Sequence, residues 1–306
     1  MDEQRAAQLR RSIQRCFQPL HGCSVADISL TRYRAAFEAL SELIEPIDTV
    51  AIEPLSIDAM PAEWFVPAQA EEGRAILYLH SGTYVCGSMR TDRAAVTRLA
   101  ELSRTCVLQF AYRLAPEHPF PAALDDALAA YRWLISQGFA PRRIALVGSG
   151  AGGGLLLALL QVLRDQDAPL PIVGACFSPL LDLTPAHLQS RSDIATDIVL
   201  NSAMLEFVAQ HYCQPSERSH PLISPLHADL HGLPPLLLIV AQNELVHDDA
   251  DRLWERARAQ RVRAHALSWS DVCHGWQLFP AAFREGERAL DQAAAYCEKY
   301  FDMGKA

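Results

Sequence analysis

The sequence lacks the patterns that mark several classes of protein. None of its eight cysteines forms a C-x-x-C pair, and its eleven histidines show no H-E-x-x-H or comparable cluster, so we expect no structural metal and no cofactor. A chain of this length does not need disulfides to fold, which makes reduced thiols in the cytoplasm the expected state. Lysine and arginine number 27 against 36 acidic residues, and the formal net charge is −9. This balance argues against nucleic acid or an acidic membrane surface as a partner.

Long apolar runs are absent as well. The longest, residues 155–160 with their flanks, is too short to span a bilayer. The chain opens on Met1-Asp2-Glu3 and then becomes arginine-rich with no apolar segment, so we expect neither a secretory signal nor a transit peptide. What remains is a chain of 306 residues, half of them hydrophobic, which can bury a large core. We therefore expect a protein that handles a small molecule as substrate or ligand.

A glycine-rich turn is the most informative stretch. The apolar run 144–147 precedes it and the leucine-rich segment 155–163 follows it, a pattern that predicts a strand, a tight turn and a helix. A nucleophile elbow, G-x-S-x-G, has this layout because small residues on both sides of the nucleophile let helix and strand pack closely. Here the flanking glycines are Gly148 and Gly152, and the central position, where the serine should be, is Gly150.

The register of this turn decides how the sequence is interpreted. Centring the turn on Ser149 would need small residues at 147 and 151, but Val147 is β-branched and belongs to the strand. We therefore centre the turn on Gly150, which adopts a positive φ without strain. A glycine offers no nucleophile.

The rest of the chain alternates predicted strands and helices. Such alternation predicts a mostly parallel central sheet flanked by helices, an α/β fold. Residues 1–45 contain two amphipathic helices and, with the insertion 184–231, are predicted to form a helical cap over a core made of 46–183 and 232–306. The predicted helices and strands are residues 3–16 and 33–43 (helices), a hairpin over 49–65, strands at 75–79, 105–112, 143–147, 172–177, 235–241 and 263–269, and helices at 122–137 and 249–260.

Several segments resemble those of one known family. The stretch His80–Ser88 resembles the oxyanion segment H-G-G-G-Y-x-x-G-S of the hormone-sensitive-lipase-like carboxylesterases, and Tyr112–Asp126 matches their segment Y-R-L-A-P-E-x-x-F-P-A-A-x-x-D almost letter for letter. The glycine-rich turn and the stretch Asp271–Phe279 follow in family order. The resemblance spans roughly residues 50 to 300 and implies the α/β-hydrolase fold with a helical cap. Family members often pair through sheet edges or C-terminal helices, so the resemblance makes a homodimer a candidate assembly.

The resemblance also implies which residues occupy the catalytic positions. The nucleophile position is Gly150 and the triad histidine is His274. The acid position, within a family segment D-E-x-x-x-D-D, is Asn243, while Glu244 would take the acid's place if the register shifted by one. Two members of the triad are therefore expected to be substituted.

The implied oxyanion and substrate-binding segment is only partly preserved. It keeps His80 and Gly82, but two of its glycines have become Ser81 and Thr83. Ala151 adds an amide after the turn, and the remaining predicted site residues are Tyr84 and Ser149.

These substitutions leave three hypotheses about activity. Acyl transfer needs a nucleophile, a base and an acid, whereas one histidine beside amides that polarise a carbonyl is sufficient for proton transfer. We therefore expect non-hydrolytic acid–base chemistry (elimination, isomerisation or cyclisation) on a small carbonyl compound or ester, with His274 as the base. The alternatives are a non-catalytic ligand-binding protein that keeps the hydrolase fold, and a weak esterase in which His274 activates water. Cys86 and Cys273 stand near the site in sequence and are interpreted as small buried hydrophobes rather than as replacement nucleophiles.

Overall fold

An eight-stranded sheet forms the centre of the molecule. The computed structural model describes residues 3–191 and 197–304. The strands follow the order β1-β2-β4-β3-β5-β6-β7-β8, and every pair from β4 to β8 is parallel, whereas β1 and β2 pair antiparallel with each other and β2 pairs antiparallel with β4. Their bounds are β1 Val50–Ile57, β2 Met60–Pro67, β3 Ala75–Leu79, β4 Cys106–Phe110, β5 Ile144–Ser149, β6 Val173–Phe177, β7 Leu236–Ala241 and β8 Ala264–Trp269.

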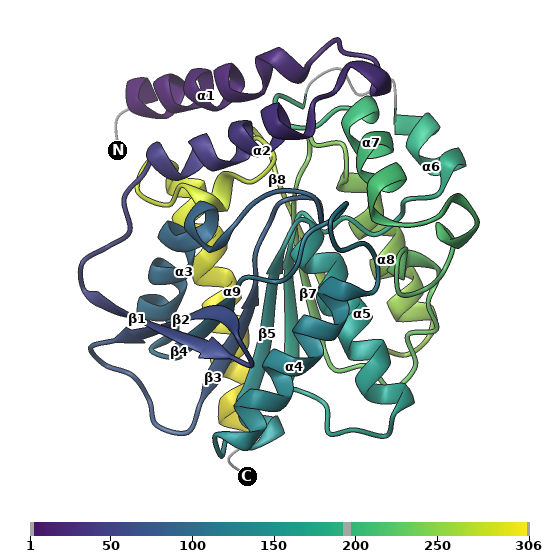
Figure 1. Cartoon of the computed structure of the whole chain (residues 1–306). Coiled ribbons are helices and arrows are strands. Elements are labelled where there is room, and N and C mark those ends of the chain that lie inside the picture. The colour runs from purple at the N-terminus through teal and green to yellow at the C-terminus, as the bar shows by residue number, and fades with distance from the viewer. Residues whose placement is uncertain (1–2, 192–196, 305–306) are drawn as a thin grey trace.

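Helices cover both faces of this sheet. In Figure 1, α4 and α5 lie in front of the strands, and α3 and α9 lie behind them. The strands β3, β5, β6 and β7 are buried along their whole length, as expected for parallel strands between two layers of helices. The helices of these layers are α3 Met89–Ser103, α4 Ala122–Ser136, α5 Ala151–Asp165, α8 His247–Ala259 and α9 Arg284–Met303. The α/β-hydrolase fold predicted from the sequence is therefore the observed one.

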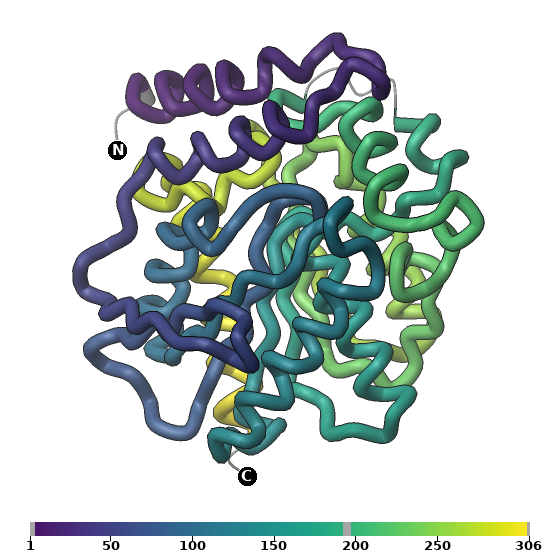
Figure 2. The backbone as a smooth tube through the Cα atoms, in the orientation of Figure 1, coloured from purple at the N-terminus to yellow at the C-terminus, as the bar shows by residue number. Residues whose placement is uncertain are grey.

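A second group of helices lies over the carboxyl ends of the parallel strands. Figures 1 and 2 show α1 (Glu3–Phe17) and α2 (Leu30–Glu38) crossing this end of the molecule, beside α6 (Pro185–Ser190) and α7 (Ser202–Tyr212). The division of the chain at residues 45, 183 and 231 stays a prediction, and residues 192–196 of the predicted insertion lie outside the described residues. Within the described residues no helix combines the length and apolar character needed to cross a membrane.

The N-terminal helices differ slightly from their predicted bounds. The helix predicted over 33–43 begins at Leu30, because the Ser29 side chain accepts a hydrogen bond from the Arg32 amide and caps the helix. It ends at Glu38 and continues as the 3-10 turn Ala39–Glu42. The apolar spacing indicated the correct face but not the cap, which lies outside the periodic residues.

Candidate active site

The turn between β5 and α5 places Gly150 at the centre of the site. Gly150 has φ 55° and ψ −117°, a conformation that L side chains rarely adopt. A Cβ on Gly148 would lie 2.3 Å from the Gly152 carbonyl oxygen, and one on Gly152 would lie 2.0 Å from the Leu79 carbonyl oxygen. Glycine is therefore required on both sides of the turn, where helix and strand touch.

Gly150 itself is under no such restriction of space. A Cβ built there meets only the Ser81 Cβ within 4 Å, at 3.8 Å, which is ordinary van der Waals contact. Gly150 lines a pocket that it shares with Ser81, Thr83 and His274. For a Cβ at this position the obstacle is the positive φ of the backbone, a strain that a nucleophile elbow carries.

The partly buried His274 and the buried Glu244 form a hydrogen-bonded pair beside this turn. Glu244 follows β7, and His274 lies in the loop after β8. The His274 Nδ1 and Glu244 Oε2 atoms are 2.8 Å apart, and the Glu244 carboxylate is fully buried. Its other oxygen, Oε1, accepts the Ala241 amide at 3.0 Å. The carboxylate is therefore oriented by the end of β7 and in turn orients the imidazole.

This geometry corrects the acid position inferred from the sequence. Asn243 is exposed, whereas Glu244 is turned inward. The Ala241 amide donates to the Glu244 carboxylate and so holds it in the position from which it reaches His274. The register inferred from the paired aspartates placed the acid one residue too early.

The surroundings of His274 set its proton affinity. Burial alone lowers the pKa of the imidazole, but the hydrogen bond to Glu244, the charge of Glu244 and the charge of Asp197 together outweigh burial, so the net pKa lies above its ordinary value of 6.5. Nε2 takes part in no hydrogen bond within the described part of the chain, and the ring lines the same pocket as Gly150.

Three backbone amides on either side of Gly150 have no internal partners among the described residues. Among the described residues, the N–H groups of Gly82, Thr83 and Ala151 donate no hydrogen bond to the protein. Gly82 and Thr83 line the pocket, and Ala151 is the first residue of α5. Unpaired amides grouped in this way can bind a developing oxyanion.

The other predicted residues of the oxyanion segment have different partners. The Ser81 amide and hydroxyl both donate to Asp92, at 3.0 and 2.7 Å, so Ser81 contributes no free amide. The His80 ring stacks on Tyr112 with centroids 3.9 Å apart, and the Tyr84 ring stacks on Tyr212 with centroids 4.0 Å apart. His80 and Tyr84 therefore support the loop by packing and are absent from the pocket lining of the described residues.

The pocket is small and mostly apolar. The space open to the centre of a water molecule is about 20 Å³, which is enough for a single water. Around Gly150 the wall is polar. Elsewhere it is formed by aliphatic and aromatic side chains, namely Ile13, Phe37 and Leu40 from the N-terminal helical segment and Val199, Leu278 and Phe279 from later in the sequence.

Comparison with known proteins identifies the family. A family model described as the alpha/beta hydrolase fold matches residues 76–278. An acetyl-hydrolase of Streptomyces hygroscopicus is 38% identical over 263 residues, 86% of this chain and 88% of that protein. A solved esterase from the bacterial hormone-sensitive lipase family is 36% identical, covers 98% of this chain and 99% of its own, and superposes with a TM-score of 0.89. This chain belongs to the hormone-sensitive-lipase-like carboxylesterase family.

The relatives also overturn the expectation of non-hydrolytic chemistry. An esterase of Acinetobacter venetianus is 34% identical over 86% of this chain and 87% of its own length. An ethyl acetate hydrolase of Pseudomonas putida is 32% identical over 84% of this chain and 86% of its own length. These relatives are named for hydrolysis, so the prediction of elimination, isomerisation or cyclisation is wrong. It rested on the loss of two triad members, whereas the structure pairs the histidine with a carboxylate.

Sequence reasoning missed residues that support this site through side-chain contacts. Asp92, fully buried at the start of α3, holds the oxyanion loop through Ser81 and also accepts a hydrogen bond from the Tyr78 hydroxyl at 3.0 Å. Gln277 donates from Nε2 to the Ser149 Oγ at 2.9 Å, joining the histidine loop to the end of β5. No local motif in the sequence marks these contacts, because the paired residues lie 11, 14 and 128 positions apart.

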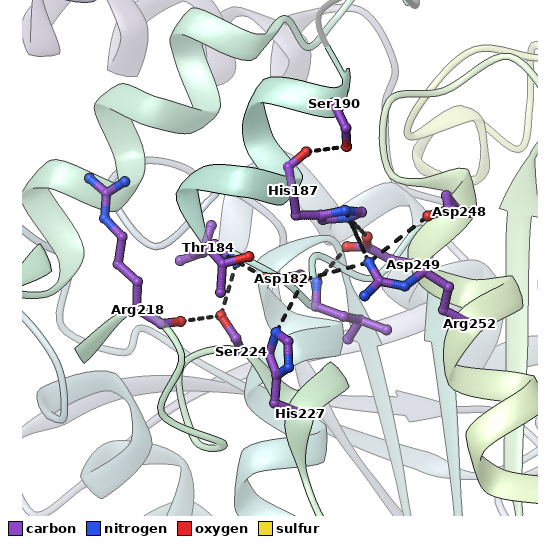
Figure 3. A network of polar contacts seen from close by, with 12 residues as sticks. Asp182, Thr184, His187, Ser190, Arg218, Ser224, His227, Asp248, Asp249 and Arg252 are labelled. Carbon is purple, nitrogen blue, oxygen red and sulfur yellow. Dashed lines mark hydrogen bonds and ion pairs between the residues drawn. The ribbon is translucent and has the colours of Figure 1, made fainter. Parts of the chain in front are cut away.

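A second polar network lies at the start of α8. Figure 3 shows His187 and Asp249 pointing toward each other, with Asp182 and Arg252 alongside. The fully buried Asp249 lies 2.6 Å from the His187 Nε2, accepts the Leu181 amide at 2.9 Å and pairs with Arg191. Asp249 therefore fixes α6 against α8 and takes no part in the pocket around Gly150.

Proposed function

We propose that this protein hydrolyses small carboxylic esters by using His274 to activate a water molecule at Gly150. The observation that carries the proposal is the hydrogen bond between the buried Glu244 and His274, beside an elbow position that has no side chain although a Cβ would fit there. The hydrolase names of its relatives support the reaction class.

The chemistry follows from what each group can do. His274 Nε2 accepts a proton from water while the water oxygen attacks the ester carbonyl carbon. The resulting imidazolium is stabilised by the Glu244 carboxylate. The tetrahedral oxyanion then collapses, the C–O bond to the alcohol breaks, and the imidazolium returns its proton to the leaving alkoxide. The products are one carboxylic acid and one alcohol, and no acyl-enzyme is formed.

The oxyanion would be stabilised by amides rather than by a charged side chain. Gly82, Thr83 and Ala151 supply N–H groups that have no other partner among the described residues. Removal of one such donor in a hydrolase costs about 10²–10³ in rate, so three amides are a large part of the available catalysis.

Nearby cysteines do not offer a substitute nucleophile. The Cys86 thiol donates to the Gly82 carbonyl oxygen at 2.9 Å, and burial raises its pKa well above the ordinary value. Burial raises the pKa of Cys273 to about 12. Neither residue belongs to the pocket lining among the described residues, and thiols in that state are poor nucleophiles.

The pocket supports a small acyl group. Its apolar wall and its limited free space favour a small apolar acyl group over a large one, in line with relatives named acetyl-hydrolase and ethyl acetate hydrolase. The eight cysteines are all free thiols, which fits the reducing cytoplasm as the place of action.

The proposal is tested with p-nitrophenyl acetate. The native chain should hydrolyse it slowly, without a burst and without a covalent adduct detectable by mass spectrometry, and His274→Ala should abolish this activity. Gly150→Ser should raise the rate at least about a hundredfold and give a trappable acyl-enzyme, because an activated serine contributes far more than water in such sites.

The controls decide between the possible failures. Equal turnover by the native chain and by His274→Ala would refute the role of the base. An acyl adduct on the native chain would refute attack by water. If Gly150→Ser also had no activity, the pocket would not be an ester-hydrolysing site.

A further inference from the structure

Two consecutive residues of the oxyanion loop, Thr83 and Tyr84, have a positive φ that side chains disfavour. Thr83 has φ 54°, and a β-branched residue with positive φ is an outlier. Such a conformation persists only where its surroundings hold it, and it is typical of functional sites. Thr83 is also one of the residues whose amide is free for an oxyanion, so the groups that hold it control the geometry of the site.

A series of hydrogen bonds from Tyr33 through Thr83 to Cys86 holds Thr83 in place. The Tyr33 hydroxyl is hydrogen-bonded to the Thr83 Oγ1 at 3.1 Å, and the Thr83 Oγ1 is 3.4 Å from the Cys86 Sγ. The Cys86 thiol donates its only proton to the Gly82 carbonyl oxygen at 2.9 Å. The sulfur must therefore accept from the Thr83 hydroxyl, and the Thr83 oxygen must accept from Tyr33. The direction of all three bonds is fixed.

This series of hydrogen bonds ends on the Gly82–Thr83 peptide bond, which supplies the oxyanion amide. The Gly82 carbonyl oxygen accepts the Cys86 thiol and also the backbone amides of Cys86 at 2.9 Å and Val85 at 3.3 Å. In a trans peptide the N–H points opposite to the C=O. Three donors on the Gly82 oxygen thus direct the Thr83 N–H away from them, and hydrogen bonds to the carbonyl also strengthen that N–H as a donor.

Tyr33, the first donor in this series of hydrogen bonds, is itself held firmly by its surroundings. It is fully buried, and its ring makes edge contacts with Phe37 at 5.6 Å and Phe207 at 6.2 Å between centroids. The next residue, Arg34, donates from Nε to the Val85 carbonyl oxygen at 2.8 Å. Helix α2 is therefore attached to the oxyanion loop through two consecutive residues.

We propose that Tyr33 is a positioning residue for catalysis: through Thr83 and Cys86 it fixes the oxyanion amide and makes α2 part of the catalytic geometry. This inference rests on the proposed esterase function for its kinetic effect, although the attachment itself does not. It also explains how the loop accommodates a threonine where the family's segment carries glycine. A glycine would need no side-chain partner, whereas Thr83 needs one.

The attachment is tested first in the native chain, without turnover. Hydrogen–deuterium exchange of the peptide containing Val85 and Cys86 should accelerate severalfold in Tyr33→Phe. The matched control is Tyr131→Phe, which removes a comparable hydroxyl bond to the Pro169 carbonyl oxygen far from the site and should leave this peptide unchanged. Unchanged exchange in Tyr33→Phe would overturn the attachment, whatever the protein catalyses.

The kinetic role is tested in Gly150→Ser. Tyr33→Phe and Thr83→Val should each lower kcat about tenfold with little change in KM, because a displaced amide affects the transition state more than substrate binding. The two changes should not add. In the Thr83→Gly background, Tyr33→Phe should have no effect. A kcat loss in that background, or none with Thr83 present, would overturn the role. An inactive Gly150→Ser parent would instead refute the esterase proposal, and hydrogen exchange alone would then decide whether Tyr33 holds the loop.

Discussion

Gln277 and Ser149 join the histidine loop to the strand that leads into the elbow. The Gln277 amide nitrogen donates to the Ser149 Oγ at 2.9 Å, and both residues are almost completely buried. The Gln277 Oε1 has no partner among the described residues. The bond therefore attaches the loop that carries His274 to the end of β5, next to Gly150.

We expect Gln277→Leu to loosen this loop. The substitution takes the Gln277 partner away from the buried Ser149 hydroxyl, which should lower the free energy of unfolding by about 1–2 kcal/mol. It should also lower the rate of ester hydrolysis more than it weakens substrate binding. Urea unfolding and steady-state kinetics measure the two effects. Gln210→Leu is the control, because Gln210 is exposed and its amide donates to Glu206 on the same helix. Equal kinetic loss in both variants would contradict the prediction.

The pH dependence of hydrolysis follows from the raised pKa of His274. The base must be neutral, so kcat/KM should rise with pH through a midpoint above 6.5 and then level off. Glu244→Gln removes the negative charge that raises this pKa while burial still lowers it, so the midpoint should move down. A pH–rate profile measures both. His118→Gln, at an exposed histidine outside the pocket, should leave the midpoint unchanged. A midpoint that rises in Glu244→Gln would contradict the assignment.

The identity of the acid can be tested separately in the Gly150→Ser variant. Glu244→Gln should lower kcat by about 10³–10⁴, because an amide cannot stabilise the imidazolium as a carboxylate does, and the equivalent change in a serine protease lowers kcat about 10⁴-fold. Asn243→Asp should change kcat less than about twofold, since position 243 is exposed and Glu244 already binds the ring. A large gain from Asn243→Asp would restore the acid position inferred from the sequence.

Asp249 should be a determinant of stability rather than of catalysis. Burial raises its pKa, but the charge of Arg191 and the contact with His187 outweigh burial and hold the pKa below 3.8. Asp249→Asn leaves Arg191 buried without its anion and should cost about 3–5 kcal/mol. Its exposed neighbour supplies the control, Asp248→Asn, which should cost less than about 0.5 kcal/mol. Urea unfolding of the two variants compares these costs.

The same carboxylate predicts how stability depends on pH. A lowered pKa means that the Asp249 contribution is complete above the ordinary pKa and is lost as the pH falls through the folded-state value. Urea midpoints of the native chain and Asp249→Asn should therefore converge toward acid pH. A difference that widens as pH falls would contradict the sign.

The sequence indicated the parts of the site that depend on local sterics. Gly148 and Gly152 could be recognised because a turn between strand and helix excludes side chains there, and the structure has the turn where the pattern places it. The choice between Asn243 and Glu244 could not be made, since it depends on which side chain accepts the Ala241 amide. The Tyr33–Thr83 contact joins residues fifty positions apart and has no local signature.

Gly150 and its two flanking glycines are under different kinds of selection, for chemistry at position 150 and for folding at positions 148 and 152. Changes at Gly148 or Gly152 would bring a Cβ within 2.3 Å of a carbonyl oxygen, so folding itself eliminates them. At position 150 a Cβ meets nothing closer than 3.8 Å, and a single base change converts a glycine codon into a serine codon. Packing is thus nearly indifferent to which residue stands there. In a lineage of related genes, variation at this position would record the history of the chemistry, while its two flanking glycines would record only the history of the fold.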